Sequence, residues 1–350
     1  MRKYLSVFFL FGLLIAPARA DKVVLVAGGP DISKGKVVDP FAVDFDQQGN
    51  LYFVELGGHR LGKIDSKGEV TTLAGSGKKG DKGDGGPASD AELNGPHHLA
   101  LLPNGDIIVA DTFNSRVRKV DARTGIIKTI AGTGEKGFSG DGGPAVVAKT
   151  GNVYCAALNS SSDKLYLADL DNRRIRMVDL KTGIITTVAG NGKRGMPEDG
   201  ATATEAPLFD PRAVAVDQKD NIWILERGGH ALRVVDARGK IRTVAGTGKA
   251  GLSGDGGDAR KAAMNGPKHL FVDRHGDVLI ADTENHCIRK FSVKDGTMSR
   301  VAGTGKKGSA GLDGPPEKAE FNRPHGVYED TNGVIYIADS SNNRIVKIVK

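Results

Sequence analysis

Residues 95–132 read GPHHLALLPNGDIIVADTFNSRVRKVDARTGIIKTIAG and contain four short runs rich in Val, Ile and Leu. The pairs Asn104-Gly105 and Thr124-Gly125 interrupt these runs, and such pairs suit tight turns that require positive φ. Short β-branched runs bounded by turn residues are typical of strands. The stretch therefore predicts one sheet of four antiparallel strands.

The same pattern recurs along the whole chain. The alanine of a closing Val-Ala-Gly phrase, or of a close variant, falls at Ala27, Ala74, Ala131, Ala189, Ala245 and Ala302, at intervals of 47, 57, 58, 56 and 57 residues. A four-stranded unit cannot bury both of its faces by itself, but units arranged in a ring cover one another. We therefore predict an all-β, six-bladed β-propeller with blades near residues 39–77, 95–134, 151–192, 210–248, 266–305 and 323–350.

The sixth copy stops at Lys350, after its third strand. Residues 22–28, KVVLVAG, match the missing fourth strand. An unpaired strand edge would otherwise be exposed. We therefore expect residues 21–29 to complete blade six and close the ring.

The first twenty residues have the features of a signal peptide. Arg2 and Lys3 precede an apolar run over residues 5–16, and Ala18-Arg19-Ala20 supplies the small residues of a cleavage site. Twelve apolar residues are too few to span a bilayer as a helix, and no later segment is longer and apolar, so we expect no membrane span. The predicted chain starts at Asp21 and is secreted or periplasmic.

Charge and cysteine usage narrow the possible partners. Without residues 1–20 the chain has 46 basic and 42 acidic residues, and the two signs are interspersed. A nucleic-acid-binding protein usually shows a concentrated basic stripe, so we expect no nucleic-acid partner. We also expect the chain to be a monomer. Cys155 and Cys287 fall in different blades and strands, which predicts two buried free thiols because a disulfide needs Cα atoms within about 7 Å.

The repeat resembles that of the NHL-repeat family. The shared pattern is Pro-x-x-Leu-Ala, then Asn-Gly-x-Ile-x-x-Ala-Asp, then Asn-x-Arg-x-Arg-Lys-Val-Asp, then Thr-Gly-x-Ile-x-Thr-Val-Ala-Gly, and it covers the chain from residue 21 onward. The resemblance implies a six-bladed propeller whose first strands line a central channel. Members of this family include binding modules and a few enzymes, so the resemblance implies no single function.

Another recurring group surrounds the turn between the second and third strands. It comprises an Asp, an Asn and an Arg, as in Asp111/Asn114/Arg116, Asp169/Asn172/Arg174 and Asp339/Asn342/Arg344. A charged ligand ring is one interpretation. Turn chemistry is the favoured one, in which the arginine returns to the carboxylate.

The copies agree least at the two residues that follow each proline position. These pairs are Phe41-Ala42, His97-His98, Val153-Tyr154, Arg212-Ala213, Lys268-His269 and His325-Gly326, and they hold four of the eight histidines. Variable side chains on a constant frame indicate a site at the channel mouth, although ordinary channel lining is an alternative. Our candidate ligand-binding residues are His97, His98, Tyr154, Arg212, Lys268, His269 and His325. The two cations among them favour an anionic ligand.

Three functions are compatible with these residues. The first is a binding scaffold for a protein, a glycan or a small anionic ligand, with no cofactor required. The second is a metal-dependent lyase or hydrolase, in which His97, His269 and His325 would hold zinc, or calcium would bind instead. The segments around His97 and His325 look like the metal-bearing strands of the peptidyl-amidoglycolate lyase propeller, but the rest of that enzyme's zinc and catalytic set finds no match. The third is a structural envelope component. No nucleophile motif is present, so we assign no catalytic residue and favour binding over catalysis.

Overall fold

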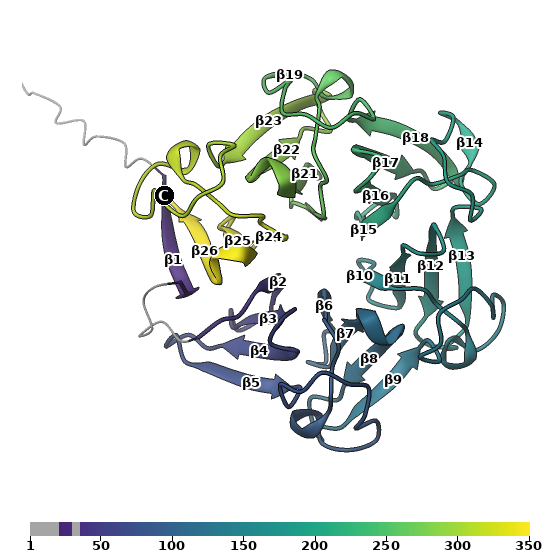
Figure 1. The fold of residues 1–350 in the computed structure, drawn as a ribbon. Coiled ribbons are helices and arrows are strands. Elements are labelled where there is room, and N and C mark those ends of the chain that lie inside the picture. Colours follow the sequence, from purple (N-terminus) through teal and green to yellow (C-terminus); the bar gives the residue numbers. More distant parts are fainter. Residues whose placement is uncertain (1–20, 30–35) are drawn as a thin grey trace, which may run out of the picture.

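The computed structural model describes residues 21–29 and 36–350, and the predicted signal peptide lies outside this part of the chain. Six antiparallel sheets are arranged radially around a central axis, as Figure 1 shows face-on. This arrangement confirms the predicted all-β, six-bladed propeller. No helix in the described residues is both long enough and apolar enough to cross a membrane.

Each blade has four main strands, which we call first to outer from the axis outward. The first strands are β2 (Pro40–Phe45), β6 (His98–Leu101), β10 (Val153–Leu158), β15 (Pro211–Val216), β20 (His269–Val272) and β24 (Gly326–Glu329). The second strands are β3 (Leu51–Glu55), β7 (Ile107–Asp111), β11 (Lys164–Asp169), β16 (Ile222–Glu226), β21 (Val278–Asp282) and β25 (Ile335–Asp339). The third strands are β4 (Arg60–Ile64), β8 (Arg116–Val120), β12 (Arg174–Asp179), β17 (Ala231–Val235), β22 (Cys287–Phe291) and β26 (Arg344–Val349). The outer strands are β5 (Val70–Ala74), β9 (Ile127–Ala131), β13 (Ile185–Ala189), β18 (Lys240–Ala245), β23 (Thr297–Ala302) and β1 (Lys22–Gly28).

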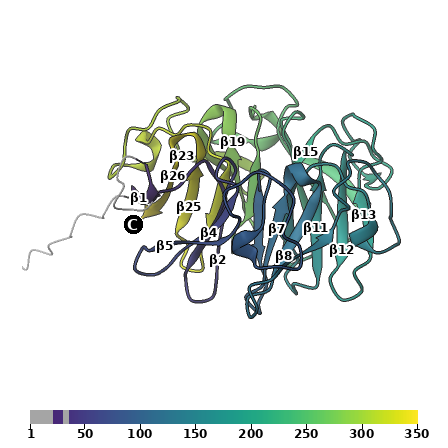
Figure 2. The ribbon, with the colours of Figure 1, turned by 60° about the horizontal axis from the view of Figure 1, so that its bottom comes forward.

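Strand β1 closes the ring, as the sequence predicted. It pairs antiparallel with β26 from Lys22 opposite Val349 to Gly28 opposite Arg344. The tilted view of Figure 2 shows β1 lying beside β26 at the outer edge of blade six. Two hydrogen bonds between the backbones of Val23 and the connector residues Asp313 and Gly314 fix the strand on its other side. The last blade is therefore built from both ends of the described chain.

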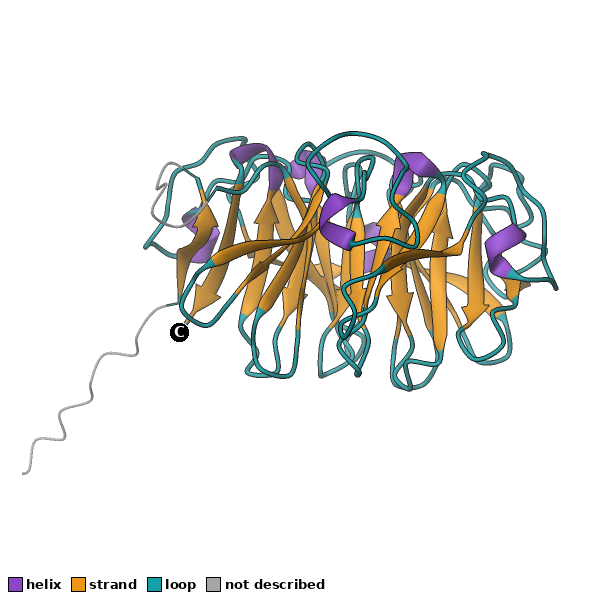
Figure 3. Ribbon diagram, turned by 90° about the horizontal axis from the view of Figure 1, so that it is seen from below, coloured by secondary structure: helices purple, strands orange, loops and turns teal. Residues whose placement is uncertain are grey.

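The two faces of the ring differ in their loops. The lower face carries the tight hairpins between first and second strands, and the upper face carries the short turns at which second strands end and third strands begin (Figure 3). Three of these upper turns are 3₁₀ helices: η3 (Thr112–Asn114), η6 (Thr283–Asn285) and η8 (Ser340–Asn342). Long connectors join each blade to the next and contain η2 (Ala88–Asp90), η4 (Ala145–Val147), η5 (Ala259–Lys261) and η7 (Pro316–Lys318). Connector residues also add short fifth strands, β14 (Ala201–Thr202) and β19 (Gly257–Asp258), to blades four and five.

The core lies between neighbouring blades, where the alternating apolar side chains of adjacent sheets meet. Trp223 of blade four and Phe291 of blade five pack across one such interface, with ring centroids 6.1 Å apart. Both cysteines are buried and unpaired, as predicted. The structure therefore needs no disulfide to hold its blades together.

Buried ion pairs hold the turns between second and third strands. In blades two to five the carboxylate that ends the second strand faces an arginine in the middle of the third strand; these arginines are Arg118, Arg176, Arg233 and Arg289. This corrects our expectation for Arg116 and Arg174, which stand two residues earlier and form no ion pair with that carboxylate among the described residues. The expectation holds in blade six, where Arg344 lies 2.7 Å from Asp339.

The glycine-rich connectors between blades take part in the same ion pairs, and we call these paired carboxylates and central arginines the turn frame. Asp84, Asp141 and Asp255 each lie 2.7 Å from the central arginine of the blade that follows. Each Gly-Asp-Gly-Gly loop thus places one carboxylate over one buried guanidinium. The arginines neutralise the charge of these carboxylates, so no ligand is needed to compensate it.

Candidate functional site

Six side chains, one at the start of each first strand, form a ring at the upper mouth of the channel, and in blades one, three and four a β-bulge places the side chain. In blade one Pro40 pairs with Glu55 but Ala42 pairs with Val54, so Phe41 is an extra residue. Blades three and four show the same shift. A bulge re-aims the side chain of the extra residue. The resulting mouth ring consists of Phe41, His97, Tyr154, Arg212, Lys268 and His325, one from each blade.

Side-chain hydroxyl groups help to hold this ring in register. Thr112, at the end of the second strand in blade two, donates a 2.8 Å hydrogen bond to the carbonyl oxygen of Val153 in blade three. Thr283 makes the equivalent bond to Pro324, and Ser340 closes the circle by donating to Pro40. Each bond ties one blade to the start of the next first strand. The mouth residues therefore sit on a rigid support.

Contacts run from one member of the mouth ring to the next. The Phe41 ring stacks on His325 with centroids 4.0 Å apart and meets the edge of His97 at 4.8 Å. His97 packs edge-on against Tyr154 at 4.6 Å, and the Arg212 guanidinium lies 4.2 Å from the Tyr154 ring centroid. On the other side, Lys268 Nζ lies 3.4 Å from His325 Nε2. In the described structure this circuit has one interruption, which falls between the two cations Arg212 and Lys268.

Arg212 is the unusual member of this ring. Its side chain is only 4% exposed, yet its Nε has no hydrogen-bond partner, and none of the ion pairs among the described residues includes it. Burial lowers its pKa to about 10, so the guanidinium still carries its charge at neutral pH. A buried charge without a counter-charge is costly unless something compensates it. Stacking on Tyr154 supplies only part of that compensation.

Lys268 is partly neutralised by a neighbour. Its ammonium group donates to Glu284 at 2.6 Å, and Glu284 also pairs with Arg323 at 2.9 Å. Burial lowers the pKa of Lys268 to about 8, and the charge of Arg212 adds to this shift. One carboxylate thus serves two cations at this edge of the mouth. With Arg212 included, positive charge is in excess there.

The histidines of the mouth ring are neutral. His97 Nδ1 lies 2.8 Å from the carbonyl oxygen of Gly95, which can only accept, so Nδ1 carries the proton. Burial lowers the pKa of both His97 and His325 well below the usual range, and the charges of Arg212 and Lys268 contribute to both shifts. The charge of the mouth therefore comes from Arg212 and Lys268.

One residue further along the first strands, a second ring lines the interior of the channel. It comprises Ala42, His98, Cys155, Ala213, His269 and Gly326. His98 and His269 come from opposite blades and meet across the channel, with their Nε2 atoms 3.0 Å apart. Val327 donates its backbone N–H to His269 Nδ1, so His269 carries its proton on Nε2 and donates it to His98. This histidine pair separates the mouth ring from the space below.

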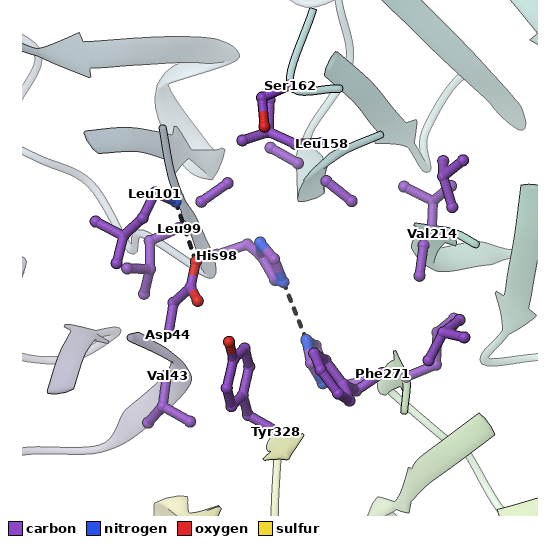
Figure 4. Close-up of a pocket in the computed structure, with 18 residues that line it drawn as sticks. Val43, Asp44, His98, Leu99, Leu101, Leu158, Ser162, Val214, Phe271 and Tyr328 are labelled. Atoms are coloured by element: carbon purple, nitrogen blue, oxygen red, sulfur yellow. Dashed lines mark hydrogen bonds between the residues drawn. The ribbon is translucent and has the colours of Figure 1, made fainter. Parts of the chain in front are cut away.

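Below the histidine pair lies a cavity of about 250 Å³ that opens toward the lower face. Thirteen of its eighteen lining residues are aliphatic or phenylalanine, and the polar ones are Asp44, His98, Ser162, His269 and Tyr328. Figure 4 shows the Asp44 carboxylate and the Tyr328 hydroxyl group on the same side of this cavity as His98. The channel therefore has two chemically different ends.

The seven predicted site residues do not share one place. His97, Tyr154, Arg212, Lys268 and His325 belong to the mouth ring, whereas His98 and His269 face the lower cavity. We expected all seven at one mouth. Successive residues of a strand lie at different depths of the channel. The consecutive residues His97 and His98, and likewise Lys268 and His269, therefore belong to different parts of it. In blade three the ring positions are Tyr154 and Cys155, one residue later than the sequence register suggested.

The geometry does not assemble the three histidines proposed for a metal. The Phe41 ring lies between His97 and His325, and His269 faces His98 instead. Among the described residues no three His, Cys, Asp or Glu side chains form a group that could hold an ion. The residues present therefore do not fit the zinc site of the lyase interpretation, and we derive no chemistry through it.

Sequence reasoning missed three residues of the channel. Phe41 stands in a variable pair but is not among our candidate residues. Asp44 and Tyr328 occupy one common position of the repeat, three residues after the mouth ring, where other blades have Ala100, Ala157, Ala215 and Phe271. The break in the repeat at this position was a signal that could have identified them.

Family models match several parts of the chain. The Teneurin NHL domain model matches residues 148–253, and the NHL repeat model matches residues 93–120, 265–291 and 321–348. NHL repeat-containing protein 2 of Gallus gallus is 28% identical over 274 residues, which cover 68% of this chain and 36% of that protein. The chloroplastic protein SUPPRESSOR OF QUENCHING 1 of Arabidopsis thaliana is 27% identical over 289 residues, or 79% of this chain and 27% of that protein. The chain thus spans about a third of these relatives.

Solved structures share the fold at low sequence identity. An auxiliary nutrient binding protein from Bacteroides thetaiotaomicron superposes with a TM-score of 0.68 at 18% identity, covering 94% of this chain and 76% of that one. Virginiamycin B lyase from Staphylococcus aureus gives a TM-score of 0.52 at 15% identity, covering 89% and 80%. These likenesses concern the fold.

Proposed function

Because the chain belongs to the NHL-repeat family of six-bladed β-propellers, we propose that it is a binding protein that holds an anionic group of a small ligand at the upper mouth of its channel. The unpaired guanidinium of Arg212 carries this proposal. Every other buried arginine of the described structure faces a carboxylate, so a carboxylate or phosphate from outside would supply what Arg212 lacks.

The neighbours of Arg212 indicate which kind of anion suits the mouth. An anionic group between Arg212 and Lys268 would complete the interrupted circuit of contacts. The rings of Tyr154 and His97 continue from that point, and the half-buried Tyr154 ring offers an apolar contact for the rest of the ligand. An aromatic or otherwise apolar carboxylate therefore fits better than a bare inorganic anion. A fold neighbour described as a nutrient-binding protein is consistent with a small-molecule ligand.

Calorimetric titration with benzoate and its neutral counterpart benzamide tests this proposal. We expect the chain from residue 21 onward to bind benzoate at least about tenfold more tightly than benzamide, because a charge-assisted pair contributes about 1.5–3 kcal/mol. Arg212→Met should abolish this preference. The matched control is Arg238→Met, which removes a charge from a side chain that is 85% exposed. Equal affinities for the two probes, or a preference that survives in Arg212→Met, would contradict the proposal.

We also propose that the protein acts outside the cytoplasm, in the periplasm or as a secreted protein. The pattern of residues 1–20 supports this, and a nutrient-binding role is compatible with it. N-terminal sequencing of protein exported from a bacterial host should give Asp21 as the first residue. Recovery of the intact N-terminus from the cytoplasm would contradict this location.

A further inference from the structure

The lower cavity is chemically distinct from the mouth ring and is separated from it by the His98–His269 pair. We infer that this cavity is a second binding site, which takes a small, mainly apolar molecule bearing a cationic amine and places the ammonium group beside Asp44. This inference is independent of the anion site at the mouth.

Asp44 provides the negative charge. It lies on β2, three residues below Phe41, and lines the cavity. Its carboxylate accepts backbone N–H groups from Phe45 at 2.7 Å and from Leu101 at 3.0 Å, but none of the ion pairs among the described residues includes it. These bonds fix the carboxylate in place without neutralising it. A cation from outside would therefore find an oriented and uncompensated partner.

The other walls of the cavity determine the class of cation. A divalent metal ion prefers six or more oxygen ligands, and here only Asp44, Tyr328 and Ser162 offer side-chain oxygen atoms. Aliphatic side chains from five blades form most of the surface and favour a hydrocarbon body. The rings of Phe271 and Tyr328 lie 4.5 Å apart, and aromatic faces attract ammonium groups. An organic amine matches all three features.

The volume of the cavity limits the size of the molecule. The interior holds about 250 Å³, which suits an amine with a single ring or a short branched chain. Small side chains in the wall leave this space free; they are Ala100, Ala156, Ala157 and Ala215.

Calorimetric titration of the chain from residue 21 onward with three probes of similar shape tests the inference. Phenethylamine carries the ammonium group, 2-phenylethanol is its neutral counterpart and phenylacetate its anionic one. We expect phenethylamine to bind at least about tenfold more tightly than 2-phenylethanol, and phenylacetate to bind most weakly. Equal or tighter binding of the alcohol, or no binding of the amine at millimolar concentration, would overturn the inference.

Two variants locate the site. Asp44→Asn should weaken phenethylamine binding about tenfold and leave 2-phenylethanol binding unchanged, because the amide keeps an acceptor but loses the charge. Tyr328→Phe should produce a smaller loss of about threefold. Glu317→Gln, which removes an exposed carboxylate from η7, is the matched control and should bind like the parent. Full amine affinity in Asp44→Asn would place the amine elsewhere and refute the assignment.

A measurement on the unaltered protein covers the case in which Asp44→Asn fails to fold. Burial raises the pKa of Asp44 to about 6, while His98, with a pKa near 4, and Tyr328, whose pKa is raised, stay neutral above pH 5. His269, the remaining titratable group of the wall, also stays neutral because burial lowers its pKa. Phenethylamine affinity should therefore fall about tenfold from pH 7.5 to 5.0. An affinity that does not change over this range would contradict the role of Asp44.

Discussion

Arg233 and Arg212 both belong to blade four, and their exposed fractions are 0% and 4%. Arg233 lies 2.7 Å from Glu226 and is part of the turn frame that recurs around the ring. Arg212 stacks on Tyr154 and faces no carboxylate among the described residues. The two side chains differ in role: the Arg233–Glu226 ion pair stabilises the blade, whereas the charge of Arg212 has no carboxylate partner and lies at the mouth of the channel.

In the described structure, a charge without a partner lies at each end of the channel. At the mouth the unpaired group is a cation, Arg212, and in the lower cavity it is an anion, Asp44. Between them the imidazoles of His98 and His269 are neutral because burial lowers their pKa. Each end is thus suited to a ligand of the opposite charge. Variants of the paired and the unpaired charges should therefore differ in their effects on stability and on binding.

The largest effect is expected when the frame is broken. Arg233→Met leaves Glu226 buried and without its partner, which should lower the free energy of unfolding by about 3–5 kcal/mol. Urea denaturation of the variant and the parent measures this difference. A loss below about 1 kcal/mol would show that the ion pair does not support the fold.

Acid should destabilise the protein through its channel histidines. Burial, reinforced by Arg212, holds the pKa of His98 near 4 in the folded chain, whereas an unfolded histidine titrates near 6.5. As the pH falls below about 6.5, only the unfolded chain gains this proton, so stability present above that pH is lost down to about pH 4.

Each such histidine contributes a slope of about 1.4 kcal/mol per pH unit. The slope of unfolding free energy between pH 6 and 4.5 should therefore be shallower by about this amount in His98→Gln. His275→Gln, which alters an exposed histidine of a lower hairpin, is the control and should keep the parent slope. Indistinguishable slopes for His98→Gln and the parent would contradict a buried, neutral His98.

The smallest effect is expected at the mouth. Arg212→Met removes a buried charge that has no counter-charge, so the free energy of unfolding should stay the same or rise by about 1–2 kcal/mol. Urea denaturation gives this value beside that of Arg233→Met. If Arg212→Met lowered the free energy of unfolding by more than about 2 kcal/mol, Arg212 would be a structural residue like Arg233, and the two arginines would not differ in role.

The fold could be predicted from the sequence because the repeat is visible in the chain itself. Six copies of one pattern gave the number of blades, and the match of residues 22–28 to a missing strand gave the closure between β1 and β26. The arginine that pairs with each turn carboxylate was harder to predict from the sequence. In blade two the strand pairing sets Arg116 opposite Asp111, and only the side-chain conformations show that Arg118 is the arginine that reaches this carboxylate.

The site could be predicted in part. Comparison of the copies identified Arg212 and Lys268 as variable channel residues, and the structure shows that they interrupt the mouth ring. It could not show that His98 meets His269 across the axis, or that Phe41 separates His97 from His325, because these contacts join different blades. Side-chain packing between distant segments decides both.

The central claim is that the mouth attracts an anion to the unpaired Arg212. A crystal of the chain from residue 21 onward, grown with 4-bromobenzoate, tests this directly through the anomalous signal of bromine. We expect the bromine within the upper mouth, above the rings of Tyr154 and His97, with the carboxylate bound to the Arg212 guanidinium and directed toward Lys268. Bromine sites confined to other surfaces, with the Arg212 guanidinium still free of any anion, would contradict the claim.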